Sequence, residues 1–350
     1  MKTLLNEKYE FIALSQKIFG RQEDFSDWGP VLGMSGQVAM DHAPHSTLTI
    51  EQREGSYLRK LAPNIDTITD TTKVLVFQIT LDRKLVATYS ERARELIIAQ
   101  IKADDRYKRI NVAQAVRRSK GTMFHGELIR DFELKAYTIL VAAHLADPLG
   151  VSTHRVVSHN GPDTATSGGF KMGLGPRASF ASDVAMRKLS PRTVFDFLLA
   201  KPKEIAEEPK SQFMKGLSYI SQSFRSSQNP LVAFMWSLAS IEAMLSTTSD
   251  KANSGALELR LRALLDENHD QIVGKFRELY KYRNALLHGN VSLPFSFDSR
   301  NLFGFNGVKH SNTAPYDIAA FTYALSLKIL QRFVELGRYD VTYDVSVSKG

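Results

Sequence analysis

Apolar residues recur at the three- and four-residue spacing of helices throughout the second half of the chain. The expected helices are residues 190–200, 209–227, 230–246, 255–267, 269–290 and 315–337. Ser190 followed by Pro191 is a typical helix start, because serine caps the first turn and proline fits its first position. The segment 230–246 is apolar on nearly all sides, so we expect it to be the central buried helix. The short connections favour an antiparallel helical bundle.

The first half of the chain mixes strand-like and helix-like patterns. Strands are expected at residues 45–52 and 72–81, which are rich in β-branched and apolar residues. The helices expected here are residues 5–19, 90–104 and 127–147, the second beginning at Ser90 as its cap. This half therefore predicts a small sheet combined with helices.

Together these patterns predict an α+β protein of two domains. Residues 1–185 are expected to form a mixed α/β domain and residues 186–350 an all-α domain, whose alternating tail at residues 341–349 is expected to add an edge strand. Residues 160–183 are dense in glycine, serine, threonine and proline, which indicates either an inter-domain connection or an ordered functional loop. A phosphate-binding loop would use Gly169, Lys171, Gly173 and Gly175. Because the Gly-Lys-Ser/Thr run of a P-loop is missing, we favour the connection.

Composition excludes several chemistries. The chain has no cysteine, which excludes disulfides, thiolate catalysis and cysteine-ligated zinc. A net charge of +8 and a pI near 9.4 favour acidic partners such as nucleic acid. The N-terminus lacks the apolar core of a signal peptide, and the uncharged stretches are too short to cross a bilayer. We therefore expect a cytoplasmic protein with no membrane partner.

Two groups of histidines could in principle bind a metal. They are His42 with His45, and His154 with His159 and Asp163. Neither group has the four-residue spacing that places two ligands on one helix face, and no Gly-x-Ser-x-Gly or HExxH segment is present. We expect no metal and no cofactor.

The strongest candidate for chemistry lies at the end of the helix expected at residues 269–290. Three pairs in the chain place a histidine after an arginine with four to six residues between them: Arg118 and His125, Arg262 and His269, and Arg283 and His288. The first pair is expected to be broken at Ser119, Lys120 and Gly121, and the second to cross between two helices. The third lies within one helix, with Asn284 after the arginine and Gly289 after the histidine.

Arginine and histidine suit the cleavage of a phosphodiester. Arginine stays charged and offers a planar fork to phosphate oxygens, whereas histidine titrates near neutrality and can transfer a proton. The negative end of the helix dipole should favour the protonated imidazole of His288. Arg283 and His288 are five residues apart, which is about 140° around a helix, so one straight helix cannot aim both at one atom. Asn284 and His288 share a face.

The surrounding segments resemble a known family. The segments IEAML (241–245), ALELRLRALL (256–265) and ELYKYRNALLHG (278–289) are similar to the Apea-like branch of the HEPN superfamily. That pattern runs from a Glu-bearing apolar helix through an Arg-containing helix to a tyrosine that precedes Arg-polar-x3-His-Gly. The resemblance covers about residues 190–340.

This resemblance implies a metal-independent endoribonuclease that works as a homodimer, with two motif helices lining one cleft on an RNA partner. Arg283 would then stabilise the transition state, His288 would act on a proton or orient the 2′-hydroxyl, and Asn284 would position substrate. Glu242 would hold Arg283, since a lone acid in an apolar helix needs a cationic neighbour. Tyr280 and Tyr282 would support the site, by stacking on a base or as core residues. Phage defence or toxin-like RNA restriction is the setting implied by analogy.

The same residues allow a purely structural interpretation. Arg283 and Glu242 would form an internal ion pair, and His288 would close the helix together with Gly289. The chain would then be a non-catalytic HEPN scaffold for dimerisation, with residues 1–185 binding a ligand, a nucleic acid or a partner protein.

Overall fold

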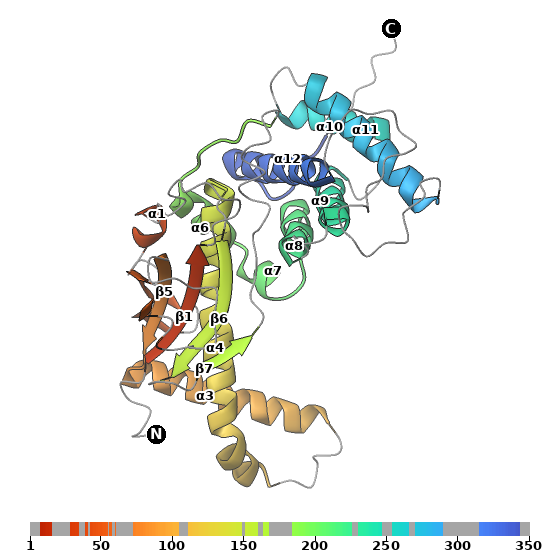
Figure 1. Ribbon diagram of the computed structural model, residues 1–350. Helices are drawn as coiled ribbons and strands as arrows, with labels where there is room; N and C mark the ends of the chain where they lie inside the picture. The colour runs from red at the N-terminus through yellow and green to blue at the C-terminus, as the bar shows by residue number, and fades with distance from the viewer. Residues whose placement is uncertain are drawn as a thin grey trace. The chain divides into compact units, whose positions relative to one another are not determined.

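The computed structural model divides the chain into two compact units (Figure 1). Unit 1 comprises residues 1–15, 26–141 and 153–169, and unit 2 comprises residues 16–25, 142–152 and 170–350. The structure describes residues 8–15, 29–34, 39–40, 43–54, 56–57, 60, 73–104, 111–148, 151–159, 164–167, 184–225, 230–246, 254–265, 270–289 and 315–343.

A five-stranded sheet forms the frame of unit 1, in the order β4-β5-β1-β6-β7. Its strands are β1 (Lys8–Ser15), β4 (Thr49–Glu54), β5 (Lys73–Thr80), β6 (Val151–His159) and β7 (Thr164–Ser167). The pairs β1 with β5, β4 with β5 and β6 with β7 are antiparallel, and Phe11 lies opposite Phe77. β2 (Ala39–Met40) pairs with β3 (Ala43–Thr47) in a separate ribbon, and α1 (Gly29–Leu32) is a single turn.

The strand β1 corrects the helix expected at residues 5–19. Tyr9 is 1% exposed and Glu10 is 4% exposed, although successive strand residues point to opposite faces of a sheet. Because β1 is covered on both faces, its sequence lacks the alternation that marks a half-exposed strand. The buried strand expected at residues 72–81 is confirmed as β5, whose Val74 to Phe77 are fully buried.

Two long helices complete unit 1, and both begin earlier than expected. The helix α3 spans Arg83–Ala103, and its N-cap is Asp82, whose carboxylate accepts from the Leu85 N–H at 2.7 Å. The expected cap, Ser90, lies buried inside this helix. The helix α4 spans Val112–Ala146, and its residues 142–146 belong to unit 2.

Buried polar side chains attach β1 and α3 to their neighbours within unit 1. The Tyr9 hydroxyl hydrogen-bonds to His125 on α4, and the Tyr89 hydroxyl donates to Asp131 on the same helix. On the other face of β1, Glu10 accepts hydrogen bonds from Tyr57 and from Gln78, the latter at 3.0 Å. These partners satisfy groups that would otherwise be costly to bury.

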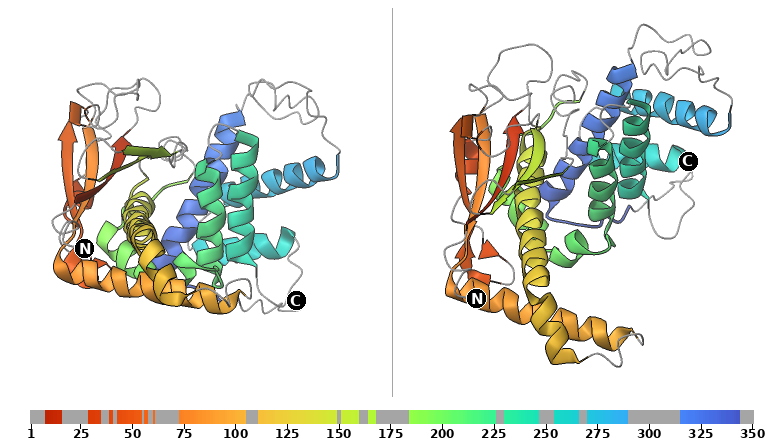
Figure 2. Two further views of the ribbon diagram at one scale, coloured as in Figure 1. Left: turned by 90° about the horizontal axis from the view of Figure 1, so that it is seen from below. Right: turned by 60° about the horizontal axis from the view of Figure 1, so that its bottom comes forward.

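Unit 2 is mostly helical in its described residues (Figure 2). Its helices are α6 (Pro191–Leu199), α7 (Pro202–Ala206), α8 (Gln212–Arg225), α9 (Pro230–Leu245), α10 (Ser254–Leu265), α11 (Asp270–Leu287) and α12 (Pro315–Leu336). The start predicted at Ser190 and Pro191 is confirmed, because the Ser190 side chain accepts from the Thr193 N–H. The expected edge strand is absent from residues 341–343, and residues 344–349 lie outside the described part.

The central helix of unit 2 is α12 rather than α9. Every described α12 residue from Ala319 to Gln331 is buried, whereas α9 keeps a half-buried strip along one side. The helices α8 and α9 run antiparallel in contact with each other, and Gly216 allows a close approach because an added Cβ would lie 2.4 Å from Met244 Cγ. Ser240 on α9 donates to the Gly216 carbonyl at 2.7 Å and accepts from Ser326 on α12.

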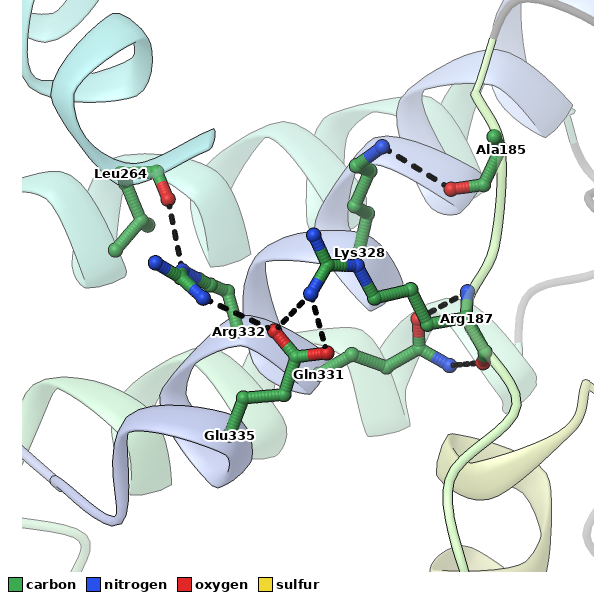
Figure 3. A network of polar contacts seen from close by, with 7 residues as sticks. All are labelled: Ala185, Arg187, Leu264, Lys328, Gln331, Arg332 and Glu335. Atoms are coloured by element: carbon green, nitrogen blue, oxygen red, sulfur yellow. Dashed lines mark hydrogen bonds and ion pairs between the residues drawn. The ribbon is translucent and has the colours of Figure 1, made fainter. Parts of the chain in front are cut away.

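Polar side chains of α12 bind the segment that leads into the helical unit (Figure 3). The Gln331 amide donates to the carbonyls of Leu145 and Arg187, both at 2.8 Å, and its oxygen accepts from the Arg187 N–H. The Arg187 guanidinium pairs with Glu335 at 2.8 Å, and Lys328 donates to the Ala185 carbonyl. The end of α4 is therefore part of unit 2, which differs from the single boundary expected at residue 185.

The described chain is mostly helical with a small antiparallel sheet, which is compatible with the α+β class. None of its described helices combines the length and the apolar character that crossing a membrane requires.

Candidate functional site

The helix α11 carries the candidate motif and ends at it. Its buried residues, Ile272, Val273, Phe276 and Tyr282, form one face towards the core. Beyond Leu287 the chain continues for one turn, in which the His288 N–H donates to the Asn284 carbonyl at 3.0 Å. Gly289 then adopts a φ of +71°, a left-handed conformation that glycine adopts without strain, and this residue ends the helix.

Arg283 contacts three groups around the last turns of α11. A guanidinium nitrogen lies 3.5 Å from a Glu242 carboxylate oxygen on α9, and another donates to the Asn284 side-chain oxygen at 2.9 Å. The guanidinium carbon lies 5.5 Å from the centre of the Tyr280 ring, a distance at which a cation is attracted to the ring face. The predicted contact between Glu242 and Arg283 is therefore present.

The Glu242 carboxylate is only partly engaged. Its side chain is 24% exposed, and its Oε1 atom is buried without a hydrogen-bond partner among the described residues. Burial and the negative charge of Glu242 raise the pKa of Tyr280, and the charge of Arg283 opposes that rise. The three side chains thus form one electrostatic group that bridges α9 and α11.

The two tyrosines of the motif helix differ in their surroundings. Tyr282 is 7% exposed and packs against Phe234 of α9, with ring centres 5.9 Å apart. Its burial raises its pKa, and its place in the core excludes stacking on a substrate base. Tyr280 is half-buried beside Arg283 and keeps an exposed part at the site. Of the two interpretations left open by the sequence, core packing therefore holds for Tyr282.

His288 is exposed at the end of the motif helix. Asn284 connects it to Arg283, because its carbonyl accepts from the His288 N–H and its side chain accepts from Arg283. The chain thus presents a cation and an imidazole at the surface at the end of α11. Their chemical roles stay predictions, and so does the positioning role of Asn284.

Two ion pairs that the sequence did not reveal hold α10 against α11. Arg277 makes a bidentate contact with Glu258, with distances of 2.6–3.0 Å, and Arg262 pairs with Asp270. The hydrogen bond from Arg277 lowers the pKa of Glu258. Charged residues on successive helices are a weak signal for such pairs, because only tertiary packing shows which ones face each other.

The sequence suggested that only the third Arg–His pair, Arg283 and His288, lies within one continuous helix, and the structure shows otherwise. Arg118 and His125 also lie within one unbroken helix, α4, because the helix runs through Ser119, Lys120 and Gly121. His125 is nevertheless bonded to Tyr9 of the sheet, which gives it a packing role. Arg283 and His288 remain distinct because the histidine is exposed at a helix end.

The other candidates lie mainly where the structure gives no description. His42, Asp163 and the four residues of the phosphate-loop interpretation fall outside the described residues. His45 lies in β3, and His154 and His159 lie in β6. Within the described residues, no group of three or more histidine, aspartate or glutamate side chains is placed to hold a metal ion.

No protein-family model, curated protein or solved structure matches the chain. The resemblance to the HEPN superfamily therefore stays a prediction that rests on the residues of α9, α10 and α11.

Proposed function

We propose that the chain is a metal-independent endoribonuclease of HEPN type that acts as a homodimer on RNA. The observation that carries this proposal is the exposed His288 at the end of α11, one turn from an Arg283 that Glu242 and Asn284 hold at the surface. A guanidinium held in this way suits a phosphate, and an exposed imidazole suits proton transfer.

In the proposed reaction the 2′-oxygen of one nucleotide attacks the adjacent phosphorus. The 2′-hydroxyl loses its proton, the bond from phosphorus to the 5′-oxygen breaks, and that oxygen takes up a proton. The products are a 2′,3′-cyclic phosphate and a 5′-hydroxyl. Arg283 stabilises the extra negative charge on the phosphoryl oxygens, and His288 moves a proton or orients the 2′-hydroxyl.

A second copy of the chain is part of this proposal. Arg283 and His288 point about 140° apart on one helix, so a single motif helix cannot direct both at one phosphate. Two motif helices related by a two-fold axis would bring the arginine of one protomer and the histidine of the other to one cleft.

The test compares wild type with Arg283→Ala and His288→Ala as full-length proteins. We expect wild type to cut RNA in the presence of a metal chelator and both variants to lose at least about 100-fold in rate, the range that one charge-stabilising or proton-transfer group supplies. Arg277→Ala is the matched control, because Arg277 lies on the same helix but contacts Glu258. Equal cleavage by all four proteins would remove the motif from the mechanism.

One observation favours the scaffold alternative. Arg283 already has an acidic partner, an amide partner and an aromatic neighbour within its own chain, which is how a purely structural arginine is held. On this alternative the chain never cuts RNA, Arg283→Ala lowers the unfolding free energy, and His288→Ala changes neither property.

A further inference from the structure

An aromatic pair lies on the outer side of α8 and α9, apart from the Arg283 group. Tyr219 of α8 and Trp236 of α9 have ring centres 5.9 Å apart and planes that differ by 21°, so they are stacked nearly parallel. Tyr219 is 40% exposed and Trp236 is half-buried. Large aromatic rings are normally buried, so a stacked pair with this much exposure is a candidate surface for a ligand.

The exposed side of α9 connects this pair to the motif. Trp236 and Glu242 are six residues apart, which places them about 120° apart around the helix and about 9 Å apart along it, with Ala239 midway between them. The half-buried strip of α9 consists of Leu231, Val232, Met235, Trp236, Ala239, Glu242 and Ala243. In the second half of this strip, the residues between the Trp236 edge and the Glu242 edge are Ala239 and Ala243.

Contacts of α9 with its neighbours show which helix borders each edge of this strip. Gly216 and Ser223 of α8 meet α9 on the Trp236 side, through Ser240 and Ser237. Arg283 of α11 meets it on the Glu242 side. The strip is therefore bordered by the aromatic stack along one edge and by the motif arginine along the other.

We propose that Tyr219 and Trp236 form a base-stacking platform that holds a single-stranded RNA across the α9 strip, beside the motif helix. The proposal rests on the proposed endoribonuclease function and names its substrate class. An unpaired base stacks on the open ring face, while the following backbone crosses the two alanines towards Arg283. Stacking on aromatic side chains is the general means by which proteins bind unpaired bases without reading sequence.

Charge on this face favours a nucleic acid over an apolar peptide. Lys215 is exposed one helical turn before Tyr219, and Arg283 borders the other edge. Glu242 is the acidic side chain of the strip, and its charge is offset by Arg283. A phosphate backbone thus meets the cation of Lys215 at one edge and a neutralised Arg283–Glu242 pair at the other, in a chain of net charge +8.

Trp236 itself provides a direct measurement, because the chain contains only one other tryptophan, Trp28. In the full-length Trp28→Phe, His288→Ala variant, which keeps Arg283 and in which cleavage is expected to be lost, we expect a single-stranded RNA of about eight nucleotides to quench Trp236 emission. A duplex of the same sequence, whose bases are already paired, and inorganic polyphosphate, which has charge but no bases, should not quench it.

Substitution of the exposed ring tests the same platform by affinity. With a fluorescently labelled RNA and the His288→Ala protein with Trp28 intact, Tyr219→Ala should weaken binding about tenfold, since one stacking partner is lost. Tyr219→Phe keeps the ring and should restore binding to within about twofold. Leu259→Ala, which changes a comparably exposed apolar residue on α10, is the control and should leave binding unchanged.

The outcomes separate this proposal from the function on which it rests. Unchanged Trp236 emission at an RNA concentration that saturates the labelled probe, or equal binding by Tyr219→Ala and Tyr219→Phe, overturns the platform even if wild type cuts RNA. Quenching by RNA together with weaker binding of Tyr219→Ala supports the platform even if wild type cuts nothing, and then only the nuclease proposal falls. Single-stranded DNA should quench Trp236 and stay uncut, because it lacks the 2′-hydroxyl.

Discussion

Glu242 and Glu258 each form an ion pair with an arginine of α11, and only one of these pairs belongs to the candidate site. Glu242 lies 3.5 Å from Arg283, and Glu258 lies 2.6 Å from Arg277. Both pairs are partly exposed, so solvent screens them and neither is expected to contribute much to stability. The two carboxylates therefore allow a role in catalysis to be separated from a role in packing.

We predict that Glu242→Gln lowers the rate of RNA cleavage by about tenfold or more, because Arg283 loses the charge that positions it. Glu258→Gln should leave the rate unchanged. Both substitutions should lower the free energy of unfolding by less than about 1 kcal/mol. Single-turnover cleavage and urea unfolding measure the two quantities, and equal cleavage rates for the two variants would contradict the assigned role of Glu242.

Glu204 gives a prediction of how stability depends on pH. Burial alone would raise its pKa, but hydrogen bonds from the backbone of Ser211 and Lys210 and from the Ser211 hydroxyl lower it from 4.5 to about 2. Because the folded pKa lies below the unfolded one, the stabilisation is complete above about pH 4.5 and is lost as the pH falls towards 2.

We therefore expect Glu204→Gln to lower the free energy of unfolding by about 1–2 kcal/mol at pH 7, less than the full shift would give, because the carboxylate keeps some exposure. The difference from wild type should shrink steadily below pH 4.5 in urea unfolding experiments. Glu208→Gln, a change at an exposed neighbour, should alter stability by less than about 0.5 kcal/mol. A difference for Glu204→Gln that is constant from pH 7 to pH 3 would show that its charge is not the cause.

The sequence pointed to Arg283, Glu242 and the Ser190 cap, but not to Glu204 or Gln331. Helix caps and motifs consist of residues that are close in the sequence, so a local sequence pattern can reveal them. Gln331, in contrast, bonds to Leu145 and Arg187, which are far from it in the sequence. Such partners depend on which helices meet, and no local pattern encodes that.

At the scale of whole elements, the contact between α8 and α9 depends on one small residue. Gly216 lies where an added Cβ would come within 2.4 Å of Met244 Cγ and 2.8 Å of its sulfur. Met244 is fully buried, so its side chain has little room to move away. Gly274, within α11, has no atom within 4 Å of the same position.

These two glycines should respond in opposite ways to the same substitution. Gly216→Ala is expected to destabilise unit 2 by about 1–3 kcal/mol, because overpacking outweighs the gain in helix propensity. Gly274→Ala should stabilise it by about 0.5–1 kcal/mol, because only the propensity changes. Thermal or urea unfolding of both variants checks this, and stabilisation by Gly216→Ala would show that α8 and α9 are further apart than the structure has them.

Elements of unit 2 were easier to predict from the sequence than those of unit 1. The six helices expected after residue 189 all exist, because each has clear periodicity and most have a proline or serine start. In unit 1, β1 was wrongly expected to be helical because both its faces are buried. The start of α4 was missed because Gly121 resembles a break, although a long helix tolerates one glycine at a cost of about 1 kcal/mol.

For the whole molecule, the division into two units does not fall at a single linker. The helix α4 contributes its last turn to unit 2, where its carbonyls meet α12 and the segment after Val184. A sequence shift towards glycine and serine indicated a boundary near residue 185, but composition cannot show that a continuous helix passes between units. Truncation at that boundary would leave Gln331 without the Leu145 carbonyl.

The proposed dimer gives a prediction for the surface next to His288. Leu287 is 55% exposed at the end of α11, where a two-fold contact of motif helices would cover it. Leu336, at the end of α12, is 38% exposed. It lies near the C-terminal end of α10, because Arg332, one turn earlier on α12, donates to the Leu264 carbonyl. Arg262 of α10 pairs with Asp270, so that region adjoins the start of α11, about 26 Å along the helix from Leu287.

Leu287→Lys should therefore weaken dimerisation at least tenfold and make cleavage fall on dilution, because it places like charges across the two-fold axis. Leu336→Lys should leave both properties unchanged. Sedimentation equilibrium over a range of protein concentrations, with cleavage rates at the same concentrations, makes the comparison. A wild-type protein that stays monomeric while it cuts RNA would contradict the shared cleft. It would also contradict the premise that one α11 cannot bring Arg283 and His288 to a single phosphate.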